Sequence, residues 1–423
     1  MYAMPQRKTI GTIGLLVATI MPLLLWVAFT PAPKTDPIIK MTGLGALSLL
    51  SCTIILSARF RFLDTYFFGL DRTYRIHRLC AEWVVLLALL HSALLTLKYM
   101  DISLLSAYQF VIPSTDFALM AGKLALYIMT GLISLILLFK LKYSWFILSM
   151  RIMGAVIFLG GYHALFVNGS DVRQNVPLFI YMLILASSAS AIFVYRSLFH
   201  GRTTKLFEYK VDEINGKGAI TEMWLSALGR PLNHYAGQFA FIRFIDSEVS
   251  DETHPFTISS GSEDPSLRFS IKNLGDYTAS IQRLKPGTHA IIEGAFGAFT
   301  FSRLAGKKQT WVAGGVGITP FLAMAHSLTN AYRVTLFYCV KTAADAVYLP
   351  ELEEIAKQLG STFRVVPVYT DTAGPVTAKE LFDTRADEFL LCGPPQMMKA
   401  INKGLLSNGV KKAKIHYEEF DLS

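Results

Sequence analysis

Three histidines lie in or beside long apolar segments, and their spacing suits metal binding. His77 and His91 are fourteen residues apart and flank the apolar run 79–90, while His163 lies in another such run. On a helix, fourteen residues rise about 21 Å and return to within roughly 40° of the same face. Histidine is costly inside a bilayer and usually marks function there, and neutral imidazole is a common axial ligand of haem iron. The pattern predicts haem ligands at two depths of a membrane. The competing interpretation is a polar histidine that simply bonds to a neighbouring helix.

The first half of the chain supplies the helices that such ligands need. Of the 423 residues, 52% are hydrophobic, and most of these precede about residue 200. Lys and Arg concentrate in the second and fourth links between apolar segments and after the sixth, so the positive-inside rule places both termini in the cytoplasm. His91 and His163 then lie level in the outer half, and His77 lies at the cytoplasmic end of its span. We predict six membrane-spanning helices, at about 10–30, 41–58, 79–99, 117–139, 145–167 and 176–199.

The remaining composition excludes several functional classes. The net charge is +9, but the basic residues flank apolar runs and no nucleic-acid motif is present, so we expect no nucleic-acid partner. The four cysteines lack metal-ligand spacing, which supports neither a disulfide framework nor a zinc site. The aromatic stretch 60–70 is expected to lie along the inner membrane surface, or to be a simple loop.

The second half changes to the pattern of a soluble protein. From about Thr204, strand-like runs such as 207–211 and 239–244 alternate with turns such as Asn215-Gly216, which predicts a small antiparallel barrel. From about Lys308 the order becomes apolar strand, Gly-rich turn and helix, which predicts a parallel α/β sheet. We therefore predict three domains, at 1–203, 204–305 and 306–423.

Two glycine-containing turns follow predicted strands of the α/β domain. The first, 314–320, lets the backbone approach a pyrophosphate, and the helix after it offers N–H groups. The second, 390–397, places the thiol of Cys392 at the carboxyl end of the sheet, where α/β folds bind ligands. Either turn alone is compatible with a structural role, with Cys392 as a buried cysteine, but the pair favours a dinucleotide site.

Two segments of the barrel carry groups that suit a flavin. Residues 254–260, His-Pro-Phe-Thr-Ile-Ser-Ser, offer backbone groups and hydroxyls to an aromatic ring system, and residues 272–278 offer N–H groups and a hydroxyl to phosphate. Together with the two turns, these segments resemble the ferredoxin–NADP reductase superfamily. With the membrane half, and in particular the segment 68–78, nearly the entire chain resembles bacterial ferric reductases and NADPH oxidase-type transmembrane flavocytochromes.

The resemblance implies a six-helix transmembrane bundle that binds haem b, followed by a β-barrel FAD domain and an α/β NAD(P)H-binding domain. It places Cys392 beside the nicotinamide ring and Phe420 on the flavin until nicotinamide displaces it, although Phe420 is alternatively a packed residue of a terminal strand. Lys341 follows a predicted strand and could meet a 2′-phosphate, which favours NADPH over NADH. The other implied contacts are His254, Pro255, Phe256, Thr257, Ser259, Gly275 and Thr278 for FAD, and Gly314, Gly315, Gly317, Thr319, Pro320, Gly393 and Pro394 for the nucleotide.

The fifth span departs from the family pattern. Two-haem members supply two histidines from each of two spans, but here the fifth span supplies only His163, and alignment puts Met150 where the second would be. We expect His91 and His163 to hold an outer haem. His77 either pairs with Met150 at a second haem, binds one alone, or meets only a lipid or propionate while Met150 fills the core. Met150 and His163 lie about 220° apart around an ideal helix, so joint ligation needs a bend or close haem approach at the glycines of this span, Gly154, Gly160 and Gly161.

We therefore expect an oxidoreductase that passes electrons from cytoplasmic NAD(P)H through FAD and haem to an acceptor at the outer face of a bacterial inner membrane. The acceptor is expected to be ferric iron or dioxygen, with a quinone-like molecule or a protein as alternatives, and membrane lipid is the other partner. A superoxide-producing NADPH oxidase is the rival within redox chemistry. A rival from another class, a membrane transporter or sensor of nicotinamide levels, would use its histidines for proton transfer and hold no haem.

Overall fold

The computed structural model describes residues 4–30, 36–60, 63, 66–67, 69–139, 143–168, 170–203 and 205–418. The chain divides into two compact units, Met1–Thr203 and Thr204–Ser423. Each unit has its own clusters of buried hydrophobic residues.

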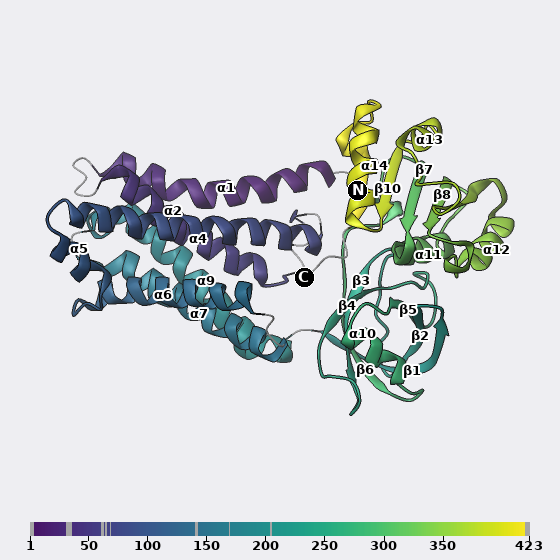
Figure 1. Ribbon diagram of the computed structural model, residues 1–423, viewed down its shortest axis with the longest axis horizontal. Coiled ribbons are helices and arrows are strands. Elements are labelled where there is room, and N and C mark those ends of the chain that lie inside the picture. The colour runs from purple at the N-terminus through teal and green to yellow at the C-terminus, as the bar shows by residue number, and fades with distance from the viewer. Residues whose placement is uncertain are drawn as a thin grey trace. The chain divides into compact units, whose positions relative to one another are not determined.

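Long helices that run side by side make up the first unit (Figure 1). They are α1 (Met4–Phe29), α2 (Pro37–Ser57), α4 (Leu70–Met100), α5 (Leu104–Val111), α6 (Phe117–Leu138), α7 (Tyr143–Phe166), α8 (Asp171–Gln174) and α9 (Val176–Thr203). Six of them are long and apolar enough to cross a membrane, which confirms the six predicted spans. The third, α4, begins well before residue 79 because arginines, which are good helix formers, continue it beyond the apolar run. His77 therefore lies inside a helix, and five of the eleven residues of the stretch 60–70 fall outside the described residues.

Local sequence explains where two of these helices begin. The carboxylate of Asp36 accepts from the N–H of Ile38 and caps α2, whose first residue is Pro37. Asp116 caps α6 in the same way, through the N–H of Leu119 at 2.7 Å. These caps place the first turns of α2 and α6, which contribute to the site.

Two glycines let α7 and α9 approach each other closely. A Cβ at Gly154 would overlap the ring of Phe193, and one at Gly161 would lie 3.3 Å from the Cβ of Ala186. Small residues serve this purpose in membrane helices. Gly154 and Gly161 therefore explain helix packing, and α7 runs as one continuous helix.

The second unit begins with an antiparallel sheet. Its strands are β1 (Leu206–Lys217), β2 (Ile220–Ala227), β3 (Phe239–Ile245), β4 (His254–Thr257), β5 (Leu267–Lys272) and β6 (His289–Phe296), with the short helix α10 (Asp276–Ser280) after β5. The strand order is β4-β3-β6-β1-β2-β5. An isolated antiparallel bridge between Ile258 and Phe269 joins the two edges of the sheet, so the strands curl into the predicted barrel-like form.

The predicted turn at Asn215-Gly216 is wrong. Both residues lie in β1 and pair with Glu222 and Thr221 of β2. The chain turns instead at Gly218, whose φ of +62° favours glycine. The hairpin formed by β1 and β2 therefore continues past Gly216 and turns only at Gly218.

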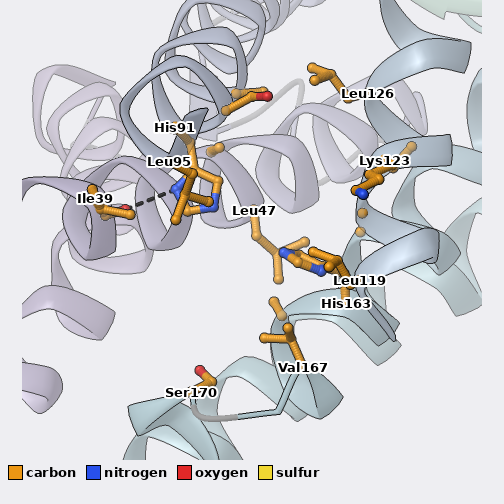
Figure 2. A pocket seen from close by; sticks show the side chains of 18 of the residues that line it. Ile39, Leu47, His91, Leu95, Leu119, Lys123, Leu126, His163, Val167 and Ser170 are labelled. Carbon is orange, nitrogen blue, oxygen red and sulfur yellow. Dashed lines mark hydrogen bonds between the residues drawn. The ribbon is translucent and has the colours of Figure 1, made fainter. Parts of the chain in front are cut away.

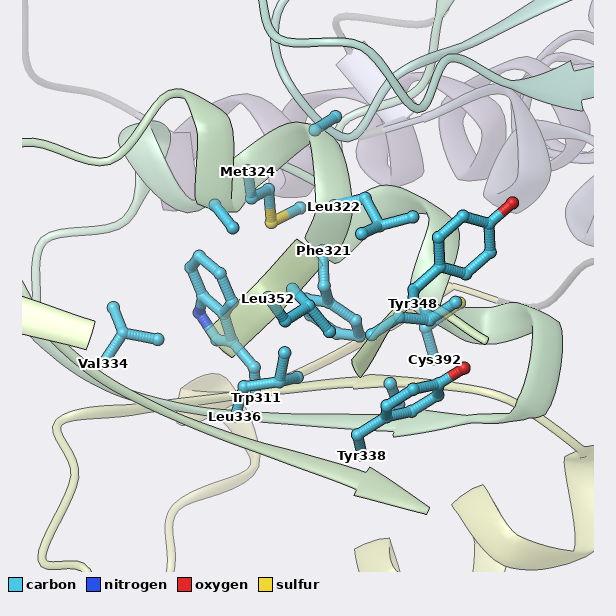
Figure 3. Packing of buried hydrophobic residues seen from close by; sticks show 14 of the residues in the cluster. Trp311, Phe321, Leu322, Met324, Val334, Leu336, Tyr338, Tyr348, Leu352 and Cys392 are labelled. Carbon is cyan, nitrogen blue, oxygen red and sulfur yellow. The ribbon is translucent and has the colours of Figure 1, made fainter. Parts of the chain in front are cut away.

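A parallel sheet completes the second unit, as predicted. Its elements are β7 (Lys308–Gly314), α11 (Thr319–His326), β8 (Arg333–Val340), α12 (Leu349–Leu359), β9 (Phe363–Tyr369), α13 (Ala378–Asp383), β10 (Glu388–Cys392), α14 (Pro395–Ser407) and β11 (Ile415–Glu418). The strand order is β11-β10-β7-β8-β9. On one face of the sheet Trp311 stacks on Phe321 of α11, with ring centroids 5.5 Å apart, beside Leu336 (Figure 3). This buried cluster fixes α11 at the end of β7, where the first glycine turn lies.

Candidate functional site

All three intramembrane histidines are tied to another helix through Nδ1, and two of them, His91 and His163, also border the same cavity. Nδ1 of His91 lies 2.9 Å from the carbonyl oxygen of Ile39 on α2, and Nδ1 of His163 lies 2.9 Å from that of Ala118 on α6. A carbonyl only accepts, so each Nδ1 carries a proton and each neutral ring presents Nε2 as its remaining donor atom. Metal-binding histidines are held in this way, because the bond at one nitrogen fixes the tautomer and the ring orientation.

A glycine on the partner helix lets each of these rings pack against the backbone. A Cβ at Gly43 would lie 2.9 Å from Cε1 of His91, and one at Gly122 would lie 2.6 Å from Nδ1 of His163. Each glycine is four residues after the carbonyl that accepts the imidazole bond, so both lie on one face of their helix. The same local arrangement therefore occurs twice, once on α2 and once on α6.

Both rings border one cavity of about 570 Å³ inside the bundle (Figure 2). His91 reaches it from α4 and His163 from α7, and its walls are mainly apolar, with Leu47 and Leu126 among them. Cofactor sites typically measure about 300–1,000 Å³. Gly160 also lines the cavity, and a Cβ there would project into open space. This glycine therefore widens the space available to a large planar ligand.

Three lysines, Lys40, Lys98 and Lys123, also line the cavity. Nζ of Lys40 donates to Oγ of Ser170 at 3.1 Å, and Nζ of Lys123 donates to the carbonyl of Ile112 at 2.6 Å. Lys40 and Lys123 are buried, which is unusual for charged residues within apolar helices. The cavity therefore suits a ligand that is largely apolar but carries anionic groups.

His77 lies in a different environment and does not border this cavity. Its Nδ1 lies 2.8 Å from the carbonyl of Thr53. On α4, His77 comes fourteen residues before His91. On α7, the residue fourteen positions before His163 is Ser149, which is only 3% exposed. Met150 is 37% exposed. On the continuous helix α7, Met150 lies about 220° around from His163 and so does not share the face that bears it. The His77–Met150 pair stays a prediction.

The two segments predicted to bind FAD lie together at one edge of the barrel. The ring of His254 stacks on that of Tyr277 with centroids 3.8 Å apart, and Nε2 of His254 lies 2.9 Å from Oε2 of Glu252. Tyr277 lies in the first turn of α10, between Gly275 and Thr278, so this contact joins the first residue of β4 to α10. Pro255, Phe256 and Thr257 follow His254 along β4.

Two hydroxyls of these segments have structural partners. Oγ1 of Thr278 accepts from the N–H groups of Leu274 and Gly275, at 2.9 and 3.0 Å, and so orders the loop. Ser259 is fully buried, and its Oγ donates to the carbonyl of Arg268 at 3.1 Å. The side chain of Ser259 therefore ties the segment after β4 to β5, and its contact with flavin stays a prediction.

The two glycine turns of the α/β domain meet at the ends of neighbouring strands. Ala313 of β7 pairs in register with Cys392 of β10. A Cβ at Gly317 would overlap the carbonyl of Cys392, and one at Gly314 would lie 2.7 Å from Cδ of Pro394. Larger side chains would push the turns apart, so the glycines allow one continuous surface at the carboxyl edge of the sheet.

The other predicted nucleotide residues surround this surface. Gly315 has a φ of +55° and Gly393 a φ of +158°, conformations that favour glycine. Thr319 and Pro320 begin α11, directly after the first turn. Lys341 is exposed at the end of β8, next to a turn in which Thr342 donates to the carboxylate of Asp345 at 2.8 Å. The role of Lys341 toward a 2′-phosphate stays a prediction.

Sequence reasoning missed a carboxylate beside Cys392. Glu418 pairs in register with Cys392 across β10 and β11, and it is 4% exposed. Burial, and secondly the charge of Glu418, raise the pKa of the Cys392 thiol well above its usual range, so the thiol stays protonated. The sequence gives no signal for this contact, because the burial of Glu418 depends on the pairing of β10 with β11. Phe420 itself lies outside the described residues.

Three family models match successive parts of the chain. The model described as ferric reductase like transmembrane component matches residues 42–161, the FAD-binding domain matches 211–293, and the oxidoreductase NAD-binding domain matches 311–403. The chain is a fusion of the ferric reductase/NADPH oxidase type. It is an integral membrane protein and an NAD(P)H oxidoreductase with FAD- and NAD(P)-binding modules. The ferric reductase-like match includes Gly43, His91 and Gly122 but ends before His163.

Individual relatives resemble only parts of this ferric reductase-type chain. The toluate 1,2-dioxygenase electron transfer component of Pseudomonas putida is 28% identical, over 44% of the chain and 60% of the relative. The flavohemoprotein of Vibrio cholerae is 29% identical, over 45% of the chain and 52% of the relative. The chain spans about half the length of the curated relatives it matches. A ferredoxin NADP+ reductase from Neisseria gonorrhoeae, solved with bound FAD and NADP, has 20% identity and a TM-score of 0.45, over 51% of this chain and 98% of that one.

Proposed function

We propose that this protein carries electrons across a membrane, from NAD(P)H through FAD and one b-type haem held by His91 and His163, to ferric iron at the opposite face. The observation that carries the proposal is the pair of imidazoles on one cavity, each tied through Nδ1 to a carbonyl of another helix. The chemistry that bound FAD and haem supply is the conversion of a hydride into single electrons and their transport.

The residues around the cavity fit a haem. Among the described residues, no group of three or more His, Cys, Asp or Glu side chains could hold a metal ion alone. Two imidazoles suffice for iron that a porphyrin already holds, because the porphyrin supplies the other ligands. The apolar walls suit the macrocycle, and Lys40, Lys98 and Lys123 supply positive charge that suits its propionates.

A single haem is proposed because His91 and His163 share one cavity, whereas α7 carries no second histidine that could pair with His77. Ser149 occupies the matching position on α7, and Met150 faces away. His77, bonded to the carbonyl of Thr53, then serves to join α4 to α2. A second haem beside His77 would need a ligand other than a histidine of α7.

The residues of the second unit hold the nucleotide for hydride transfer. The turns at Gly314 and Gly393 let backbone N–H groups approach phosphates, and α11 directs its positive end toward them. The thiol of Cys392 is protonated and fully buried, so it shapes the nicotinamide pocket and does not act as a nucleophile. No covalent step on the protein is needed.

The proposed direction is supported by the distribution of basic residues, which by the positive-inside rule favours a cytoplasmic second unit and an acceptor at the outer face. The test uses proteoliposomes that contain a trapped, impermeant ferric chelate and receive NADPH outside. We expect the trapped chelate to be reduced, and His91→Ala to abolish this while it retains reduction of soluble dyes by FAD. Chelate reduction only on the side of the nucleotide would contradict the proposal.

Dioxygen is the alternative acceptor, and the same vesicles distinguish it. If cytochrome c reduction is fast and sensitive to superoxide dismutase while the chelate is reduced slowly, the protein is a superoxide-producing oxidase. A haem-supplemented preparation without a Soret band would instead favour the transporter or sensor of nicotinamide levels.

A further inference from the structure

A buried ion pair joins the barrel to the α/β domain inside the second unit. Arg268 lies on β5 of the barrel and Glu351 on α12 of the α/β domain. Nη1 of Arg268 lies 2.8 and 3.0 Å from the two carboxylate oxygens of Glu351. The side chain of Arg268 is 4% exposed and that of Glu351 is 25% exposed. Buried pairs of this kind are strongly coupled, whereas exposed pairs contribute little.

The second terminal nitrogen of the guanidinium, Nη2, bonds to the segment that follows β4. Nη2 of Arg268 donates to the carbonyl of Ser259 at 3.0 Å, and Oγ of Ser259 donates to the carbonyl of Arg268 at 3.1 Å. The ring of Trp224 lies 5.1 Å from the guanidinium carbon, and Oε2 of Glu222 lies 3.7 Å from Nη1. One arginine therefore contacts both the flavin-binding segment and the nucleotide-binding domain.

Glu351 is in turn bonded to the helix that follows the first glycine turn. Nε2 of His326 lies 2.8 Å from Oε1 of Glu351, and His326 is the last residue of α11. A second contact joins the segment after β4 directly to the end of α11, because the N–H of Ser262 donates to Oγ of Ser327 at 3.2 Å. A continuous chain of polar contacts thus runs from the flavin-binding segment to the helix that starts at the phosphate-binding turn.

We infer that Arg268, Glu351 and His326 are positioning residues that set the angle between the flavin-binding barrel and the nucleotide-binding domain, and with it the distance over which hydride passes. Reacting atoms must approach to about 3–3.5 Å, and a misplacement of ~1 Å can cost about 100-fold in rate. None of the three is among the residues expected to touch FAD or nucleotide, so they act through the residues that do. The inference depends on the FAD- and NAD(P)-binding modules and is independent of haem.

The lowered pKa of Glu351 agrees with a network of charged side chains that it forms with Arg268 and His326. Burial by itself would raise the pKa of this carboxyl, but the hydrogen bond from His326 and the charge of Arg268 outweigh it and lower the pKa to about 2. Glu351 is therefore ionised throughout the physiological range, and its neutral isostere removes the attraction without removing bulk.

The test uses the full chain with FAD bound, mixed rapidly with NADPH without oxygen, and follows the bleaching of the flavin. Glu351→Gln removes the charge, and Glu354→Gln is the matched control, because Glu354 lies on the same helix and pairs with Lys357 at 3.6 Å on its exposed side. We expect Glu351→Gln to lower the limiting rate of flavin reduction at least tenfold. FAD content and the Kd of NADPH should be unchanged, and Glu354→Gln should match the wild type.

Further readouts separate positioning from general stability. Glu351→Asp, which keeps the charge, should recover part of the limiting rate. A limiting rate of Glu351→Gln within twofold of the wild type would overturn the inference, as would a loss of rate that merely follows a loss of bound FAD. Since flavin reduction precedes every later electron transfer, failure of the proposed haem route would leave these results unaffected.

Discussion

Replacing Gly122 by alanine is expected to displace His163 from its ligand position. The added Cβ would lie 2.6 Å from Nδ1 and 2.7 Å from Cγ of the imidazole. Non-bonded heavy atoms rest at about 3.5–4.0 Å, so the ring must retreat by about 1 Å. A metal ligand has to be held within about 0.5 Å of its productive position. The retreat exceeds that tolerance and stretches the 2.9 Å bond to the carbonyl of Ala118.

The bundle itself should tolerate this change. Loss of the imidazole bond costs about 1 kcal/mol, whereas alanine in place of a helical glycine contributes about 1 kcal/mol of stability. The two terms nearly cancel, so the melting temperature should stay close to that of the wild type. Gly131→Ala on the same helix is the matched control, because a Cβ there meets none of the described neighbours within 4 Å.

The assay is the absorbance spectrum of haem-supplemented protein, with haem measured per chain. We expect Gly122→Ala to lose most of its bound haem and of its six-coordinate spectrum, while Gly131→Ala keeps both. Wild-type haem content and an unchanged spectrum in Gly122→Ala would refute the reasoning, because they would show that the contact with Gly122 does not position the ligand.

Three further predictions concern the second unit. Cys392→Ala should slow flavin reduction by NADPH by roughly tenfold or more while FAD stays bound, because the thiol shapes the junction of the two turns; stopped-flow rates equal to the wild type would contradict this. Lys341→Ala should reduce the preference for NADPH over NADH by about tenfold, which corresponds to one charge-assisted contact of about 1.5 kcal/mol, and an unchanged ratio of kcat/KM values would show that Lys341 does not read the 2′-phosphate. The pKa of Glu351 is lowered from 4.5 to about 2, so its contribution to stability is present above pH 4.5 and disappears as the pH falls toward 2. Melting temperatures should therefore fall less steeply with acid in Glu351→Gln, and parallel curves for variant and wild type would count against the ion pair.

The architecture was largely accessible from the sequence, because hydrophobic length and strand periodicity report directly on spans and sheets. The six spans and the change from an antiparallel to a parallel sheet were predicted. The boundaries were less accessible. Helix α4 extends through a basic segment that hydropathy excludes, and the hairpin turns at Gly218 because β1 and β2 pair beyond Asn215.

The sequence predicted which residues form the candidate site, but it did not predict the groups that hold those residues in place. The histidines stand out as polar residues in apolar runs, whereas the carbonyls of Ile39 and Ala118 that hold them depend on which helices pack together. Met150 was chosen by alignment to a family pattern, although the fourteen-residue spacing of His77 and His91 points to Ser149 as the matching position before His163. The structure adds that Ser149 is buried whereas Met150 is partly exposed. Glu418 was missed because a single carboxylate in a short strand gives no periodic signal.

Haem content per chain tests the central claim most directly. We predict one haem per chain by the pyridine haemochrome method in fully supplemented protein, with a reduced-minus-oxidised spectrum of a six-coordinate b-type centre. His77→Ala should retain that haem, and the double variant His91→Ala, His163→Ala should lose it. Two haems per chain, or full colour in the double variant, would contradict the account.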